Sequence, residues 1–256
     1  MRHFPTLLIH ELRMLMVSLS TYVAGVLFLT VMGLLYFFVL YYYDSQMETE
    51  LPSAQYFQLF WLPVLFMVPL LTMKSVAEER RLGTLEALLT TRASVLEIVL
   101  AKFGAAYLWY MLLWGLTMLY PWIAQQYLPI GRIDPRLMDG ASLLGGYLFV
   151  AVSGLLYVAL GLFASSLTRS TLVAGMLSFG LLFVLIIGCN LLAHAQVQEM
   201  TGLGRFQPIL DYLPTFQHLA DFSVGWVDTR PFFLYASNTL LVLGLTTLAV
   251  EARGGA

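Results

Sequence analysis

Charge is what this sequence has least of. Only 11% of its 256 residues are Asp, Glu, Lys or Arg, whereas a soluble domain carries about 25%. Apolar residues make up 59%, and the formal net charge is −2. No cluster of basic residues provides the electrostatic footprint of a nucleic-acid-binding protein. The composition therefore favours a membrane protein and argues against nucleic acid as a partner.

Cysteine is nearly absent as well. Cys189 is the single cysteine, which excludes an internal disulfide framework and a metal site built from cysteines alone. His10 and Glu11 amount to half a metal site at most, because no further ligand follows at a suitable spacing. The phosphate-binding pattern G-x-x-x-x-G-K-[ST] is missing too. We expect no catalytic residue, no metal and no cofactor in this chain.

Long runs without any charge are what the chain has instead. A helix needs roughly 20 apolar residues to cross about 30 Å of hydrocarbon. Six charge-free runs reach that length: 14–43, 51–73, 103–131, 140–168, 170–198 and 231–250. We therefore predict an all-α, polytopic membrane protein with a single domain over residues 1–256. The predicted spans are about 19–43, 56–76, 98–124, 142–165, 171–195 and 231–250.

Lysine and arginine are distributed unequally between the two sides of these spans. If the N-terminus is cytoplasmic, nine of the 13 lie on the cytoplasmic side and four on the outer side. This positive-inside bias predicts that both termini lie on the cytoplasmic side of the membrane. We expect that membrane to be a bacterial inner membrane. A cleavable signal peptide fits poorly, because the lead-in contains Glu11 and precedes an apolar run too long for such a peptide.

The residues before the first span have an amphipathic pattern. Phe4 and Leu8 fall on one apolar stripe of a helix over residues 1–17, whereas Arg13 lies largely elsewhere. We predict a helix that lies in the cytoplasmic membrane interface. Its characteristic residues are Phe4, Leu8, Glu11 and Arg13.

The last outer segment, about 196–230, is long and rich in aromatic residues. TFQHLADFSVG predicts a short helix that begins near Thr215. A freely mobile loop would have no need of so many aromatic side chains. We predict a partly membrane-associated segment, with a candidate outer gate formed by Phe206, Phe216, Phe222 and Trp226.

Charge is concentrated in one cytoplasmic loop, residues 77–97. The stretch EERRLGTLEALLTT begins in it, and Glu78 can pair with Arg81 at i,i+3. Gly83 interrupts the helical pattern, after which Thr84 can cap a new short helix. Glu86 is favourable near the positive N-terminus of that helix.

The apolar side of this stretch consists of four leucines, Leu82, Leu85, Leu88 and Leu89. Ser94 and Glu97 then form an S-x-x-E capping box that opens the helix of the third span. A helix of about two turns is marginal by itself and needs a surface to pack on. Two interpretations remain at this point: the stretch rests on lipid headgroups, or it docks against a cytoplasmic partner.

Residues 69–108, PLLTMKSVAEERRLGTLEALLTTRASVLEIVLAKFGAAYL, resemble the loop signature of type-2 ABC-transporter permeases. The resemblance is to the gliding-motility-type branch, with the nitrous-oxide-reductase maturation permeases as cousins. Residues 161–179, GLFASSLTRSTLVAGMLSF, and residues 213–243 agree with it. Arg92 departs from the pattern, which leaves the end of the short helix open.

The resemblance implies a six-helix permease whose short loop helix is a coupling helix. That helix would sit in a groove of a separate ATP-binding subunit, which holds ATP and Mg²⁺, and the N-terminal helix would flank it as an interface helix. A second permease chain, identical or related, is implied too. By matching position, the coupling residues are Glu78, Glu79, Arg80, Arg81, Gly83, Thr84, Leu85 and Glu86, to which the pattern adds Leu88 and Leu89.

Two other functions are disfavoured by the residues. An ion-coupled secondary transporter usually carries titratable groups inside the membrane, and His194, near the outer end of the fifth span, is the only candidate. An intramembrane prenyl-protein protease requires an arginine where this chain has Gly83. H-E-x-x-H is missing as well. With these alternatives disfavoured, the resemblance implies the permease subunit of an ABC exporter, in contact with membrane lipid.

Overall fold

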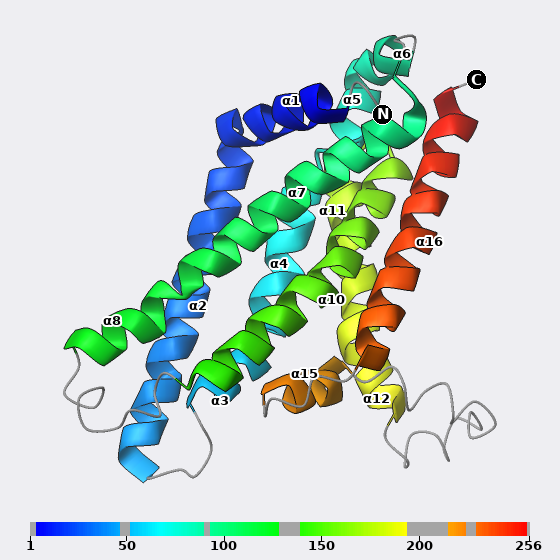
Figure 1. Ribbon diagram of the computed structural model, residues 1–256. Helices are drawn as coiled ribbons and strands as arrows, with labels where there is room; N and C mark the ends of the chain where they lie inside the picture. The colour runs from blue at the N-terminus through cyan, green and yellow to red at the C-terminus, as the bar shows by residue number, and fades with distance from the viewer. Residues whose placement is uncertain are drawn as a thin grey trace.

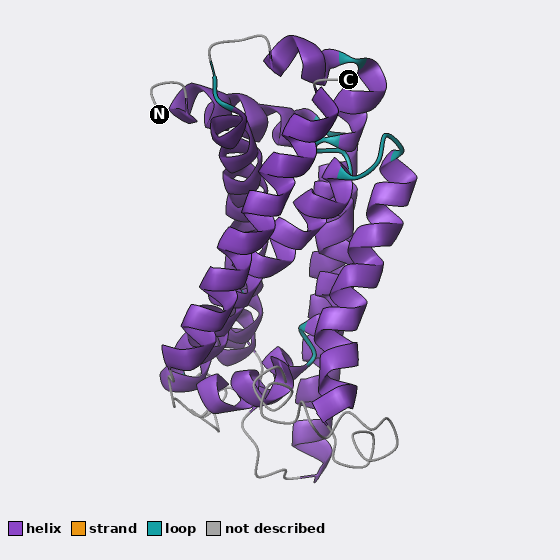
Figure 2. Ribbon diagram, turned by 90° about the vertical axis from the view of Figure 1, so that its right-hand side faces the viewer, coloured by secondary structure: helices purple, strands orange, loops and turns teal. Residues whose placement is uncertain are grey.

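The computed structural model describes residues 4–46, 52–89, 93–127, 139–193, 215–223 and 229–254. Over these residues the chain is helical and contains no strand (Figures 1 and 2). In chain order the elements are α1 (Phe4–Val17), α2 (Leu19–Gln46), α3 (Pro52–Gln58), α4 (Trp61–Thr72), α5 (Ala77–Leu82), α6 (Thr84–Leu89), α7 (Val95–Thr117), α8 (Leu119–Tyr127), α10 (Gly140–Ser166), α11 (Thr171–Phe183), the π-helical turn η2 (Val184–Gly188), α12 (Cys189–Ala193), α15 (Thr215–Ser223) and α16 (Thr229–Gly254).

Within the described residues, six helical segments are long and apolar enough to cross a membrane, which confirms the predicted fold class and the six predicted spans. They are Leu19–Tyr43, Trp61–Leu82, Val95–Tyr127, Gly140–Ser166, Thr171–Leu192 and Thr229–Ala252. The second segment runs past residue 76, where the predicted span ends. The reason is that Ser75 and Val76 connect α4 to α5 by turns. The helical segment therefore continues into the first charged residues of the loop.

The second span is broken near its outer end. Two amides, those of Leu59 and Phe60, bond to carbonyls three residues back, and α4 begins after them. Pro63 has no N–H for the carbonyl four residues earlier, so an α-helix cannot continue unbroken through this point. Helices α3 and α4 are thus separated by a break just before Pro63, whereas Pro69 lies farther inside α4.

Helix α10 is the centre of the bundle. Its span is 72% buried, against 22% for the span that contains α11. Its glycines allow close contact: a Cβ at Gly146 would lie 2.3 Å from the ring of Phe57, and one at Gly154 would lie 2.3 Å from the ring of Tyr110. The small residues of this span therefore let the side chains of α3 and α7 pack directly on its backbone.

The elements outside the spans gather at the two ends of the bundle. Helix α1 lies across one end, the same end at which α5, α6 and the C-terminal end of α16 are found (Figure 1). Helices α3 and α15 lie at the other end. At that end Asn190 connects two elements, because its amide nitrogen donates to the carbonyl of Ile186 in η2 and its oxygen accepts from the amide of Phe216, 3.4 Å away.

Candidate functional site

The short helix α5 is tied to the interior at its start by Ser165 of α10. The Ser165 hydroxyl accepts from the amides of Val76 and Ala77, both at 3.1 Å, and donates to the carbonyl of Met73 at 3.2 Å. Val76 is the N-cap of α5 and provides no side-chain cap of its own. A buried serine from another helix therefore satisfies amides that a helix start leaves without partners.

Arg80 ties the middle of α5 to two further helices. Its guanidinium donates to the carbonyl of Ser166, the last residue of α10, and to the carbonyl of Ala249 in α16 at 3.0 Å. Carbonyls in the last turn of a helix lack intrahelical partners, and the helix dipole makes that end attractive to a cation. Arg80 thus faces the bundle, whereas the sequence predicted contact with an ATP-binding subunit.

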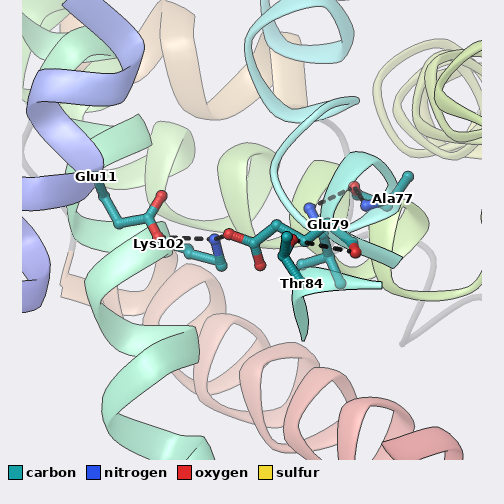
Figure 3. Close-up of polar contacts among 7 residues, drawn as sticks. Glu11, Ala77, Glu79, Thr84 and Lys102 are labelled. Carbon is teal, nitrogen blue, oxygen red and sulfur yellow. Dashed lines mark hydrogen bonds and ion pairs between the residues drawn. The ribbon is translucent and has the colours of Figure 1, made fainter. Parts of the chain in front are cut away.

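Glu79 meets Lys102 on the other side of α5 (Figure 3). The Lys102 Nζ lies 2.6 Å from Glu79 Oε1 and 2.7 Å from Glu11 Oε1. The lysine side chain is 1% exposed, so its charge depends on these two carboxylates rather than on water. We call Glu11, Glu79 and Lys102 the charged triad. It brings together α1, α5 and α7.

Gly83 separates α5 from α6. Its φ of 72° lies in the left-handed region that glycine adopts without strain, and its amide donates to the carbonyls of Arg80 and Glu79. The prediction that Gly83 interrupts the helix is confirmed. Thr84 differs from its predicted role as a cap: it is the first residue of α6, and its hydroxyl donates backwards to the carbonyl of Glu79 at 3.3 Å.

The leucines of this stretch divide between the interior and the surface. Leu85 is 4% exposed and belongs to the core, so within this chain it faces the bundle and not a partner. Leu82 is 64% exposed, and Leu88 is half-buried. The side chains of Glu86 and Leu89 lie outside the described part of the chain. Leu82, and not Leu85 as predicted, is therefore the exposed leucine that can make an apolar contact with a partner.

The outward face of α5 is small and mixed in character. Glu78 and Arg81 pair at 3.6 Å, as the i,i+3 spacing predicts, and both are partly exposed. Together with Leu82 they present one acid, one base and one large apolar side chain. Residues 90–92 lie outside the described residues. After them, the capping box of Ser94 and Glu97 begins α7, as predicted.

Helix α1 packs on α7 and places its predicted residues on different faces. Leu8 lies in contact with α7, since a Cβ at Gly104 would be 3.1 Å from its Cδ1. Phe4 and Glu11 are half-buried, and Arg13 is exposed. The outward side is not purely polar, because it also carries the following exposed apolar residues: Ile9, Met14, Met16 and Val17.

The candidate outer gate is described only in part. Phe206 and Trp226 lie outside the described residues. Phe222 is 1% exposed and Phe216 is half-buried, and both rings contact other aromatic side chains of the core. The described part of this segment, α15, therefore packs against the bundle. Its service as a gate stays a prediction.

Lys102 and Ser165 hold α5 in place but do not stand out in the sequence. Lys102 stands one residue before a charge-free run, and in the sequence it contributes only to the positive charge of the cytoplasmic side. A lysine that continues directly into a membrane span is expected to be paired, and that signal could have pointed to two acidic partners. Nothing in the local pattern distinguishes Ser165 from Ser166, because the difference depends on which residue faces α5.

A comparison with known protein families matches residues 40–219 to the family described as ABC-2 family transporter protein. These residues make up more than half of the chain and include Glu79, Arg80, Lys102 and Ser165. The chain belongs to the ABC-2 transporter family. ABC-2 permeases are membrane components that work with an ATP-binding subunit and are not ATPases themselves. No curated protein matched the chain.

Among the described residues of this ABC-2 permease, no group of three or more His, Cys, Asp or Glu residues is placed to hold a metal ion. The contacts that α5 makes with the rest of the chain are ion pairs and hydrogen bonds to other helices. These contacts connect α5 to α7, α10 and α16 at one end of the bundle, and Lys102 extends them to α1.

Proposed function

We propose that this chain is the membrane-spanning subunit of an ATP-binding-cassette exporter. A separate subunit binds ATP and Mg²⁺, and the segment α5–α6 receives its movement and passes it to the spans. A second permease chain, identical or related, completes the path for the substrate. The finer resemblance, to the gliding-motility-type branch, rests on residues 69–108 and on the two stretches that agree with them.

The observation that carries this proposal is the way α5 is attached. Ser165, Arg80 and Glu79 hold it to α10, to α16 and, through Lys102, to α7. A short helix of this kind is marginal by itself. Here, however, every side of α5 that faces another helix of the bundle makes a buried or charged contact. A push on α5 would therefore reach several spans instead of being lost in a flexible loop.

The outward face of α5 favours a protein partner over lipid headgroups. A helix that rests on headgroups turns its apolar residues toward the acyl chains and its basic residues toward phosphate. In this segment Leu85 is turned into the bundle, and an acid, Glu78, stands beside Arg81 on the exposed side. We infer that Leu82 and Arg81 contact the ATP-binding subunit.

The side of the membrane is inferred from charge. Helices α1, α5 and α6 and the end of α16 lie at the same end of the bundle (Figure 1). In the sequence, nine of the 13 basic residues fall on the side that includes these elements. The positive-inside rule therefore supports a cytoplasmic location for this end, with both termini on the cytoplasmic side of a bacterial inner membrane.

The test is purification of the tagged chain from its native membranes, with identification of co-purifying proteins by mass spectrometry. The wild type should retain an ATP-binding protein. Leu82→Asp should lose it, because an exposed apolar contact is replaced by a charge. Gln217→Asp adds the same charge to an exposed position of α15, at the opposite end of the bundle, and should retain the ATP-binding protein.

Retention of the ATP-binding protein by Leu82→Asp would show that α5 is not the docking face. If the wild type retains no ATP-binding protein while other membrane complexes survive the same purification, the proposed function fails. A second permease chain in the same eluate would support a pair of unlike permeases.

A further inference from the structure

The charged triad connects two helices whose main packing partners differ. Helix α1 packs on α7 and α2, whereas α5 packs on α6 and α11. The Lys102 ammonium stands between them, with Glu11 of α1 at 2.7 Å and Glu79 of α5 at 2.6 Å (Figure 3). Each of these contacts is a charge-assisted hydrogen bond, the stronger class of such bonds.

Burial makes this arrangement intolerant of the loss of its cation. The Lys102 side chain is 1% exposed, and the side chains of Glu11 and Glu79 are 16% and 28% exposed. Without the ammonium, two carboxylates would face each other in a poorly hydrated place, and like charges at such a site repel. Breaking a buried ion pair by removing one partner is therefore more disruptive than removing a surface pair.

Lys102 is also well placed to transmit force. It lies in the second turn of α7, a helix of 23 residues, which corresponds to a length of roughly 35 Å at 1.5 Å per residue. The start of α7 is held independently, because Ser94 and Glu97 exchange hydrogen bonds of 3.2 Å in the capping box. Loss of the Lys102 charge would thus free α1 and α5 without removing the cap of α7.

We propose that Lys102 is a positioning residue that makes α1, α5 and the start of α7 move as one body. The inference rests on the proposed function, in which an ATP-binding subunit pushes on α5. Movement of α5 then reaches α7 through Glu79, and α1 follows through Glu11. The amphipathic helix at the membrane surface is in this way part of the moving unit and not a passive anchor.

The first measurement needs no partner. Spin labels at Met14→Cys in α1 and Leu82→Cys in α5, both exposed positions, report the distance between these helices in the purified chain, with Cys189→Ala as the background. The wild type should give one narrow distance distribution. Lys102→Met, which keeps the buried volume but removes the charge, should broaden it. Glu11→Gln and Glu79→Gln, which release one helix each, should broaden it less.

The second measurement uses the chain co-purified with the ATP-binding subunit. Labels at Tyr127→Cys and Phe233→Cys, both 75% exposed, report on the end of α8 relative to the start of α16. ATP with vanadate should shift this distance in the wild type. In Lys102→Met the ATP-binding subunit should be retained but the shift lost, and Glu251→Gln, which neutralises an exposed carboxylate of α16 outside the charged triad and the outward face of α5, should leave both measurements at wild-type values.

Two results would overturn the proposal. One is a narrow α1–α5 distribution in Lys102→Met together with a full nucleotide-dependent shift. The other is an unchanged α1–α5 distribution in all three variants of the triad. Absence of an ATP-binding subunit from the wild-type preparation would instead overturn the proposed function, and with it the transmission step, while the first measurement still decides whether the triad joins α1 to α5.

Discussion

Phe222 presents its carbonyl oxygen directly to the backbone of Gly145. A Cβ built at Gly145 would lie 1.8 Å from that oxygen and 2.8 Å from the carbonyl carbon. Both of these atoms belong to backbone, so neither can turn away as a flexible side chain would. Helix α15 therefore lies where it does because α10 has no side chain at this position.

Gly145→Ala should displace α15 from α10. We expect a loss of about 1–3 kcal/mol of stability, the usual cost of an overpacked core, and faster hydrogen exchange over residues 215–223. The matched control is Gly244→Ala in α16, where the added Cβ meets nothing within 4 Å. That change should be neutral, or stabilising by about 0.5–1 kcal/mol, because glycine is unfavourable inside a helix. Equal melting temperatures for the two variants would contradict the close approach.

Ser165→Ala should loosen α5 from the bundle. The amides of Val76 and Ala77 would lose their acceptor while remaining buried, at a cost of about 1–3 kcal/mol. Ser166→Ala is the matched control, because the Ser166 hydroxyl donates to Phe163 within its own helix at 2.7 Å. The measurement is thermal unfolding in detergent, with hydrogen exchange at residues 76 and 77. The account of Ser165 fails if the two variants lose equal stability.

Arg80→Met and Arg81→Met should behave differently although the arginines are neighbours. Arg80 donates to carbonyls of α10 and α16, and the loss of such charge-assisted bonds costs about 1.5–3 kcal/mol. The Arg81 side chain is 59% exposed and pairs with Glu78, a kind of contact worth about 0–1 kcal/mol. Limited proteolysis near the end of α16 should accelerate only in Arg80→Met.

For binding of the ATP-binding subunit we expect the reverse: Arg81→Met should have the larger effect and Arg80→Met the smaller one. Arg81→Met should weaken retention of the ATP-binding subunit, since Arg81 lies on the exposed face of α5. If proteolysis of α16 accelerates equally in both variants, the bond from Arg80 to Ala249 does not hold the two helices together.

The sequence predicted the spans well, because charge-free runs and the length of a membrane-crossing helix leave little freedom. It also predicted the break at Gly83, the pair of Glu78 with Arg81 and the capping box at Ser94, all of which depend on neighbours within a few residues. These features are local in the chain, so local patterns suffice to find them.

The inward contacts of α5 could not be predicted in the same way. Glu79 and Lys102 are 23 residues apart, and Lys102 and Glu11 are 91 residues apart. Which face of α5 points inward depends on how α1, α10 and α16 pack around it, and the leucine pattern alone placed Leu85 on the partner side. The pattern shows that an apolar side exists but not what covers it.

The π-helical turn at Val184–Gly188 gives the fifth span one residue more than an α-helix would use there. The amide of Cys189 donates to the carbonyl of Val184, five residues earlier, and Asn190 follows at once with its bond to the amide of Phe216. If this turn rewound as an ordinary α-helix without a change in chain length, the residues after it would rotate by about 100°. Asn190 would then face away from α15. Removal of one residue from the turn would instead be absorbed, and Asn190 would keep its direction. The extra residue in this turn thus makes the hydrogen bond between Asn190 and α15 depend on whether the turn is wound as a π-helix or as an α-helix.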